Sequence, residues 1–260
     1  MKKLTSVLLC ALALLALPAA RAGTVLVAAA SDLAYCIDAL GAAFGKQVPG
    51  ARVKVSLGSS GNIFAQVRRG APFEVFMSAD MAYPARLAAE GGADAATLIP
   101  YAVGRIALWS PDARFGHGSG LRVLLDARVK RIAIANPDVA PYGRAAREAL
   151  RAQGLWDAVQ AKLVVGENIA QTAQFVESGN AQFGILSMST LSGSRLKGTG
   201  SHYLIPDAGL APIEQGAIVT TRGKANPLAA RFVRFLRSPA ARAILLGNGF
   251  ALPAPAPAHG

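Results

Sequence analysis

Short apolar runs alternate with segments of helical periodicity along most of the chain. The runs 24–30 and 53–57 enclose a segment, 33–47, whose apolar residues recur every three or four positions, as on one face of a helix. Strands that alternate with helices in this way predict an α/β fold with largely parallel sheets. Further strands are predicted at 74–77, 98–109, 131–135, 163–165, 183–186 and 213–221, and further helices at 62–69, 82–90, 142–154, 169–178 and 229–246.

The C-terminal part of the chain carries two further signals. Ser238-Pro239 interrupts the last helical segment, so two consecutive helices are predicted there. Residues 252–260 alternate Pro and Ala and predict an extended, frayed tail. Beyond the first residues of the chain, no stretch is long and apolar enough to span a bilayer, so stable membrane insertion is not expected.

The N-terminal residues have the pattern of a secretory signal peptide. Lys2 and Lys3 precede an apolar run, 7–17, and Ala20-Arg21-Ala22 places small residues before the expected cleavage after residue 22. A retained membrane anchor is the alternative, but the run is shorter than the roughly 20 residues that cross a bilayer. A signal peptide over 1–22 predicts export to the periplasm as a soluble protein.

Composition narrows the classes of partner. The chain of 260 residues has 27 basic and 15 acidic residues, a net charge of +12. Beyond the signal segment the basic residues are scattered, and the only adjacent pairs in the sequence there are Arg68-Arg69 and Lys130-Arg131. We therefore expect no nucleic-acid-binding surface, and only a mild preference of the surface for anions. Cys36 is alone after cleavage, which excludes an intramolecular disulfide and suits a buried apolar position on the first helix.

Three junctions between a strand and a helix carry small or polar residues, at 29–32, 58–62 and 136–143. A helix start offers unpaired N–H donors and a positive dipole end, and serine hydroxyls add donors without adding charge. In open α/β sheets such junctions lie at the carboxyl ends of strands, where ligands bind. Each serine alone is also compatible with a plain helix cap. The three junctions together predict a site for an anion.

Two of these junctions and a further segment carry a family resemblance. Residues 28–31, 58–61 and, most specifically, 70–80 (Gly-Ala-Pro-Phe-Glu-Val-Phe-Met-Ser-Ala-Asp) resemble the periplasmic molybdate-binding proteins of ABC importers. The similarity continues in order through 136–137, 145–150, 154–156, 166–169, 184–185 and 226–227.

The resemblance implies the two-lobed fold of type II periplasmic binding proteins, in which each lobe is a mixed, mostly parallel sheet flanked by helices. Lobe one is then 23–104 with 216–251, and lobe two is 105–215. The backbone crosses between the lobes twice, near 103–106 and near 213–217. The implied ligand is molybdate or tungstate, with no cofactor and no cation site. The implied partners are the membrane permease subunits of the importer, and the protein itself is expected to be a monomer.

The family pattern also implies the binding residues. Ser31 and Ser60 match its two serines, and Tyr142 and Ile169 match its backbone donors in the second lobe. Ser59 is a weaker candidate. Ser187 is another, and it stands where many members have a tyrosine hydroxyl.

Asp32 departs from a site made of neutral donors, because a carboxylate repels a dianion. We expect it to face away in the first turn of its helix, where it complements the dipole. The alternatives are that Asp32 is protonated in the complex, or that the ligand is another tetrahedral oxyanion. Phosphate keeps a proton and suits a carboxylate acceptor, and sulfate differs from molybdate in size.

Other classes of function have weaker support. A periplasmic serine hydrolase using Ser60 would need a base, yet no Gly-x-Ser-x-Gly motif occurs, and His117, His202 and His259 lie in loops or the tail. No cluster has the spacing of metal ligands. A ferric site would favour adjacent tyrosines, whereas Tyr142 and Tyr203 are far apart. The sequence therefore predicts a binding protein and no enzyme.

Overall fold

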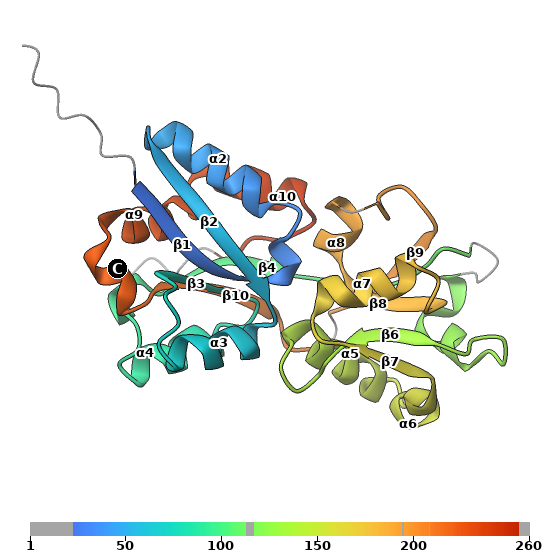
Figure 1. The fold of residues 1–260 in the computed structure, drawn as a ribbon. Helices are drawn as coiled ribbons and strands as arrows, with labels where there is room; N and C mark the ends of the chain where they lie inside the picture. Colours follow the sequence, from blue (N-terminus) through green and yellow to red (C-terminus); the bar gives the residue numbers. More distant parts are fainter. Residues whose placement is uncertain (1–22, 113–116, 194, 208, 255–260) are drawn as a thin grey trace, which may run out of the picture.

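The computed structural model describes residues 23–112, 117–193, 195–207 and 209–254. They form two five-stranded sheets side by side, each with its own helices (Figure 1). The first sheet has the order β2-β1-β3-β10-β4, with strands β1 (Gly23–Ala30), β2 (Ala51–Gly58), β3 (Val75–Ser78), β4 (Ile99–Gly104) and β10 (Ile213–Val219). The second has the order β7-β6-β8-β5-β9, with strands β5 (Ile106–Ser110), β6 (Ile132–Ala135), β7 (Leu163–Gly166), β8 (Phe183–Ser187) and β9 (Ser201–Leu204).

Both sheets are mixed in the same way. β1 runs parallel to β2 and β3, while β10 is antiparallel to β3 and β4. In the second sheet β6 is parallel to β7 and β8, and β5 is antiparallel to β8 and β9. The predicted α/β class with two mixed, mostly parallel sheets is confirmed. We call the two halves lobe one and lobe two.

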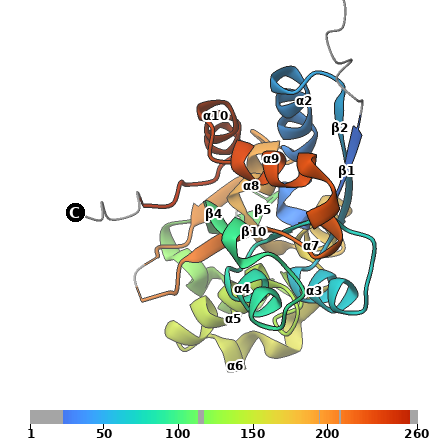
Figure 2. The same cartoon turned by 90° about the vertical axis from the view of Figure 1, so that its left-hand side faces the viewer.

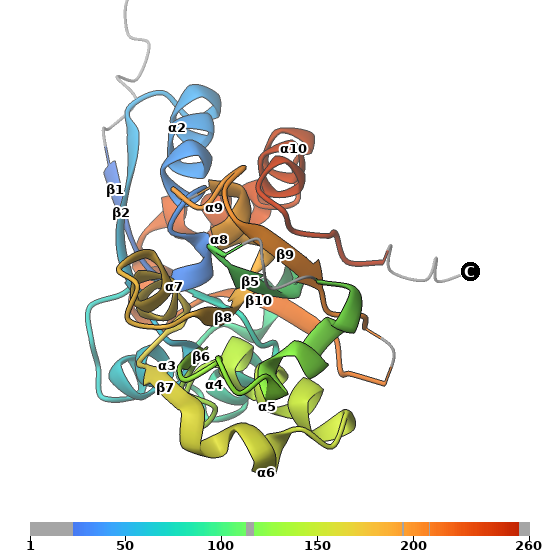
Figure 3. The same ribbon diagram turned by 90° about the vertical axis from the view of Figure 1, so that its right-hand side faces the viewer.

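Helices cover both faces of each sheet. On lobe one, α2 (Ile37–Gln47), α9 (Pro227–Phe235) and α10 (Pro239–Gly247) lie on one face, and α3 (Ser60–Arg68) and α4 (Ala82–Ala89) on the other (Figure 2). On lobe two, α5 (Pro141–Ala152) and α6 (Trp156–Val159) lie on one side of the strands, and α7 (Ile169–Glu177) and α8 (Met188–Gly193) on the other (Figure 3). Short 3-10 turns complete the chain: η1 (Ser31–Leu33), η2 (Ala95–Thr97), η3 (His117–Leu125), η4 (Gln160–Lys162) and η5 (Arg222–Ala225).

Alternation along β1 explains why the sheet of lobe one is covered on both faces. Val25 and Val27 belong to the core under α2, α9 and α10, while Ala28 belongs to the core under α3 and α4. Successive side chains of a strand point to opposite faces, so an uninterrupted apolar run supplies both cores. The aromatic centre of the first core is Phe232, with its ring centroid 5.2 Å from that of Phe44.

The two crossings between lobes fall close together. Arg105 alone separates β4 in lobe one from β5 in lobe two, so the strand expected at 98–109 is two strands in different sheets. The chain returns between β9 and β10. Ile213 already pairs with Gly104 in the first sheet, which places β10 wholly in lobe one, whereas the sequence placed residues up to 215 in lobe two.

Several element boundaries differ from those expected. The helix predicted to begin at Leu33 begins at Ile37, because Ser31–Leu33 forms the 3-10 turn η1 instead. The elements η3, α6, α8 and β9 were not predicted, since each is short or follows another element without a turn signal. Cys36 is buried as predicted, but it lies just before α2.

Two predicted segments lie outside the described residues. These are the signal peptide, 1–22, and the last six residues of the C-terminal tail, 255–260. Just before the tail, Ala251 forms an isolated antiparallel bridge with Val103 of β4. Among the described residues, no helix combines the length and the hydropathy that a membrane span requires.

Candidate functional site

A small cavity lies between the two lobes, at the carboxyl ends of β1, β2 and β3. Its volume in this conformation is about 10 Å³, roughly the space that a single water molecule occupies. Lobe one and lobe two both contribute to its wall, which consists of Ala30, Ser31, Asp32, Gly58, Ser59, Ser60, Ala79, Ala140, Pro141, Tyr142, Asn168 and Ile169. The fold thus gathers six of the seven predicted site residues, and Ser187 is the exception.

Two consecutive serines at the start of α3 present hydroxyls to the cavity. Ser59 occupies the N-cap position, yet its hydroxyl makes no capping bond and has no partner, although the residue is 3% exposed. The Ser60 hydroxyl accepts the N–H of Ala79 at 3.0 Å, which leaves its own proton for another acceptor. Ser31 is equally buried, in η1. Among the described residues, neither the Ser59 nor the Ser60 hydroxyl donates a hydrogen bond to another group, and Ser59 makes no capping bond.

The wall from lobe two is formed by the starts of two helices. α5 begins at Pro141, which has no N–H, so Tyr142 carries its first backbone donor. α7 begins at Ile169, and the Asn168 side chain caps the N–H groups of the next two residues, Ala170 and Gln171. First-turn N–H groups have no partner within their helix. Tyr142 and Ile169 accordingly offer backbone donors and two positive dipole ends to the cavity.

Asp32 lies inside this site, so the expectation that it faces away is wrong. One carboxylate oxygen, Oδ2, accepts the Tyr142 hydroxyl at 2.8 Å and the Gln215 amide at 2.5 Å. Gln215 in turn accepts the Tyr101 hydroxyl at 2.6 Å. The other oxygen, Oδ1, is buried without a hydrogen-bond partner. The network joins η1, β4 and β10 of lobe one to α5 of lobe two.

Burial dominates the ionisation of this network. Desolvation raises the pKa of Asp32 from 3.8 to about 6, although the bonds from Gln215 and Tyr142 and the nearby backbone N–H groups of Asp32 and Leu33 oppose the rise. Burial also raises the pKa of Tyr142 well above 10, and the nearby Asp32 adds to that effect, so Tyr142 remains a hydroxyl donor at neutral pH. The pKa of Cys36 rises to about 12 for the same two reasons, which keeps it an unreactive thiol.

We expect Asp32 to make the stability of the ligand-free protein decrease as pH rises between about 4 and 6. The folded-state pKa of about 6 exceeds the ordinary value of 3.8, so the folded protein holds a proton here that the unfolded chain has released. The contribution of Asp32 is full below that interval and is lost above it. Urea unfolding of wild type and Asp32→Asn at pH 4 and pH 7 measures this. A difference in unfolding free energy between the two proteins that does not change with pH would contradict it.

Direct contacts hold the lobes together around the cavity. The Gly61 N–H donates to the Val139 carbonyl at 2.9 Å, and Asn62 donates to Glu167 at 3.1 Å. A Cβ at Gly61 would lie 2.9 Å from the Val139 oxygen, so this approach requires glycine.

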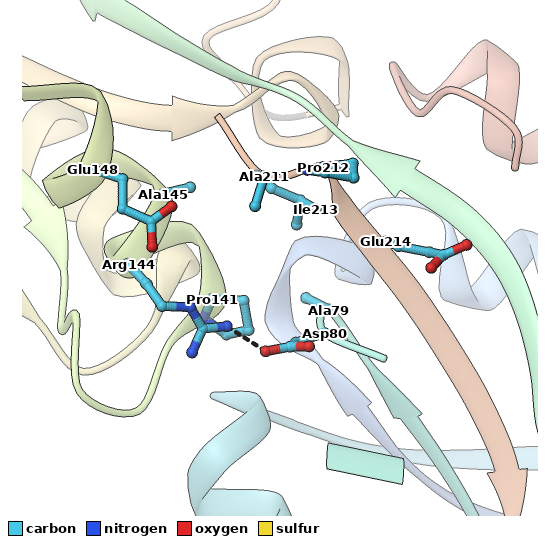
Figure 4. A pocket seen from close by; sticks show the side chains of 10 residues that line it. All are labelled: Ala79, Asp80, Pro141, Arg144, Ala145, Glu148, Ala211, Pro212, Ile213 and Glu214. Carbon is cyan, nitrogen blue, oxygen red and sulfur yellow. Dashed lines mark hydrogen bonds and ion pairs between the residues drawn. The ribbon is translucent and has the colours of Figure 1, made fainter. Parts of the chain in front are cut away.

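A second pocket on the other side of Ala79 also spans the lobes, and there Arg144 of α5 forms an ion pair with Asp80 (Figure 4). Glu148 and Glu214 lie on the wall of the same pocket. The described conformation is therefore one in which the lobes have closed on each other.

The remaining candidates lie away from the cavity. The Ser187 hydroxyl, in lobe two, bonds to Ser189 at 2.9 Å and Thr190 at 2.8 Å. His202 lies on β9, the far edge of the second sheet, next to Tyr203. No histidine or cysteine lines the cavity, and the described residues contain no group of three or more side chains suited to a metal ion. A hydrolase using Ser60 would thus lack a histidine base among its cavity neighbours.

Sequence reasoning missed Gln215, which links Tyr101, Asp32 and Tyr142. A single glutamine within a predicted strand carries no signal of such a role, because its partner Asp32 is 183 positions away in the chain. The Asp80–Arg144 pair was missed for the same reason.

Comparison with known proteins agrees with this geometry. The chain is 39% identical to the molybdate-binding protein ModA of Azotobacter vinelandii over 235 residues, 90% of this chain and 92% of that protein. It is 37% identical to ModA of Rhodobacter capsulatus over 236 residues, 91% of each. The solved Azotobacter vinelandii periplasmic molybdate-binding protein matches with a TM-score of 0.83 and 33% identity, covering 88% of this chain and 100% of that one. Residues 25–251 match the family described as bacterial extracellular solute-binding protein, and the chain belongs to that family.

Proposed function

We propose that this protein captures molybdate or tungstate between its lobes and delivers the anion to an ABC importer. The observation that carries the proposal is a cavity between the lobes that is lined by three serines and two helix starts, with no cationic side chain in its wall. Neutral donors suit a dianion that stays unprotonated at neutral pH, because such a ligand accepts hydrogen bonds and donates none. The relatives named as molybdate-binding proteins support the same ligand.

Binding follows from how the donors are divided between the lobes. Ser31, Ser59 and Ser60 donate hydroxyls from lobe one, and the Tyr142 and Ile169 amides donate from lobe two. Only the closed form completes this shell, so the anion shifts the population toward closure. The bodies that move are lobe one, 23–104 with 213–251, and lobe two, 105–212. Capture and release need no covalent step, so the protein acts as a carrier and not as an enzyme.

The carrier acts outside the cytoplasmic membrane. A cleaved signal peptide over 1–22 exports the chain to the periplasm, where it acts as a soluble monomer. Its closed form docks on the membrane permease subunits of the importer, which open it and receive the anion. The solved relative is described as periplasmic, which supports this location.

Phosphate is the second candidate ligand, and one observation favours it. Asp32 Oδ1 is a buried acceptor without a partner, and a phosphate that retains a proton would donate to it. Sulfate has no proton to donate to Asp32, so the size of the cavity determines whether sulfate or the larger molybdate binds.

Titration separates these ligands. We expect molybdate and tungstate to raise the unfolding free energy by about 2.7 kcal/mol at a concentration roughly 100 times the dissociation constant. Thermal unfolding with molybdate, tungstate, sulfate and phosphate in parallel measures the effect. Stabilisation by phosphate or sulfate alone would replace the proposed ligand. Hydrolysis of an ester substrate that is lost in Ser60→Ala would instead indicate the enzyme.

Replacing Ser60 by Ala should weaken molybdate binding roughly ten- to hundredfold. A hydrogen bond to a charged group contributes about 1.5–3 kcal/mol, and alanine removes this donor. Isothermal titration calorimetry measures the change. Ser238→Ala is the matched control, because the Ser238 hydroxyl caps α10 at 3.2 Å from the Ala241 N–H, far from the cavity. It should cost about 0.5–2 kcal/mol of stability and leave affinity unchanged. Equal affinity in both variants would remove Ser60 from the site.

A further inference from the structure

Asp32 sets this cavity apart from a shell of neutral donors. It is the charged residue in the cavity wall, it is 1% exposed, and its Oδ2 already accepts two hydrogen bonds. Its Oδ1 is buried and has no partner. A dianion in the same cavity faces an ionised Asp32 without intervening solvent. Like charges at such close range, with little water between them, repel each other strongly.

The groups closest to Asp32 do not relieve that repulsion. Tyr142 and Gln215 bond to it, Tyr101 bonds to Gln215, and Cys36 lies nearby. The pKa values of both tyrosines are raised well above 10 and that of Cys36 is raised to about 12, so all three stay neutral between pH 6 and 8.

The charged side chains on the surrounding elements are either distant or already paired. α7, α8 and β2 pack against η1, and α8 has no ionisable residue. Glu177 ends α7, at the opposite end from Ile169, and Arg52 and Lys54 pair with Thr24 and Leu26, away from the Ala30 end of β1. At the rim, Glu167 bonds to Asn62, and Arg144 pairs with Asp80. Arg105, between the lobes, donates to the Gly249 carbonyl at 3.3 Å.

We propose that anion capture by this protein is coupled to the uptake of one proton by Asp32, which makes Asp32 a donor to the bound anion. The inference rests on the proposed function. The proton comes from solvent and attaches to Oδ1, no other bond forms or breaks covalently, and Oδ2 keeps its bonds to Tyr142 and Gln215. The carboxyl group then has one oxygen that accepts and one O–H that faces the anion. Its own negative charge is gone, so the dianion no longer faces a like charge.

Proton uptake fixes the sign of the pH dependence. Below about pH 6 the free protein already holds the proton, because burial raises the pKa of Asp32 to that value. Above it, each capture must draw a proton from solvent, so affinity approaches a tenfold fall per pH unit and falls roughly fiftyfold between pH 6 and pH 8. Capture is therefore favoured on the acidic side of neutrality and release on the basic side.

Asp32→Asn is the informative variant. The asparagine oxygen can accept from Tyr142 and Gln215 as Oδ2 does, while its NH₂ group takes the place of the protonated oxygen. It should bind molybdate with an affinity that does not change between pH 6 and 8. At pH 8 it should bind up to about a hundredfold more tightly than wild type. Asp80→Asn is the control, because it removes a carboxylate outside the cavity wall and should keep the wild-type slope.

Isothermal titration calorimetry with molybdate, in two buffers of different ionisation enthalpy at pH 7.5, counts the protons directly. We expect about one proton taken up per anion by wild type and by Asp80→Asn, and none by Asp32→Asn. Molybdate binding by wild type without proton uptake, or a slope that persists in Asp32→Asn, overturns this inference and leaves the proposed function standing. No binding of molybdate by wild type at any pH overturns both.

Discussion

Ser59→Asp should abolish molybdate binding and leave the fold intact. Ser59 is the N-cap residue of α3, and its unpaired hydroxyl lines the cavity. Aspartate is as good an N-cap as serine and complements the helix dipole, so the start of α3 tolerates it. The new carboxylate, however, stands at hydrogen-bonding range from the anion. At about 4 Å and an effective dielectric constant near 20 the repulsion is about 4 kcal/mol per charge pair, roughly a thousandfold in affinity.

Ser59→Asn isolates the charge from the change of shape. Asparagine is nearly isosteric with aspartate and caps a helix equally well, but it is neutral. Calorimetric titration of both variants, with urea unfolding of the ligand-free proteins, makes the comparison. We expect affinity to be far lower for the aspartate variant than for the asparagine variant at similar stability. If both lose binding equally, size and not charge is responsible, and the electrostatic description of the site is wrong.

Phe232→Ala should destabilise the protein by about 3–5 kcal/mol, the usual cost of removing a large buried aromatic side chain. Phe232 is 0% exposed at the centre of the core between the first sheet and α2, α9 and α10. Its ring meets that of Phe44 edge-on at 5.2 Å and stacks on that of Phe235 at 6.2 Å. Alanine leaves a cavity and removes both aromatic contacts.

Leu246→Ala is the control for this prediction. Leu246 lies on α10 of the same lobe but is 52% exposed, so its truncation should change the unfolding free energy by about 0.5 kcal/mol or less. Equilibrium urea unfolding of the two variants gives both values. A loss below about 1 kcal/mol for Phe232→Ala would show that the core of lobe one repacks around the vacancy.

Local pattern was enough to predict most of the fold. The uninterrupted apolar run of β1 identifies a buried strand, and apolar residues every three or four positions identify the helix α2. Pattern failed where three-dimensional context decides. Arg105 is the one charged residue in the apolar segment 98–109, and periodicity alone does not show that the chain changes sheet there. The crossing near 103–106 was expected from the family resemblance and not from the pattern.

The binding site was predictable in part, from residue types at helix starts and not from periodicity. Serines beside helix starts, together with the family resemblance, pointed to Ser31, Ser60, Tyr142 and Ile169, and the fold brings them to one cavity. The orientation of Asp32 was not predictable, because it depends on Tyr142 and Gln215, which are 110 and 183 positions away. A carboxylate at the start of a helix normally complements the dipole, and here burial between the lobes overrides that preference.

The bridge between Ala251 and Val103 has a practical consequence for watching the lobes move. It fastens the end of the chain to lobe one, where β1 also lies, so both ends of the described chain belong to the same moving body. Fluorescent reporters attached at the two ends of the described chain, near residues 23 and 251, would keep a constant separation and give no signal. A dye pair must straddle the hinge instead, and Leu57 on β2 and Val165 on β7, 46% and 49% exposed, are attachment points on opposite lobes.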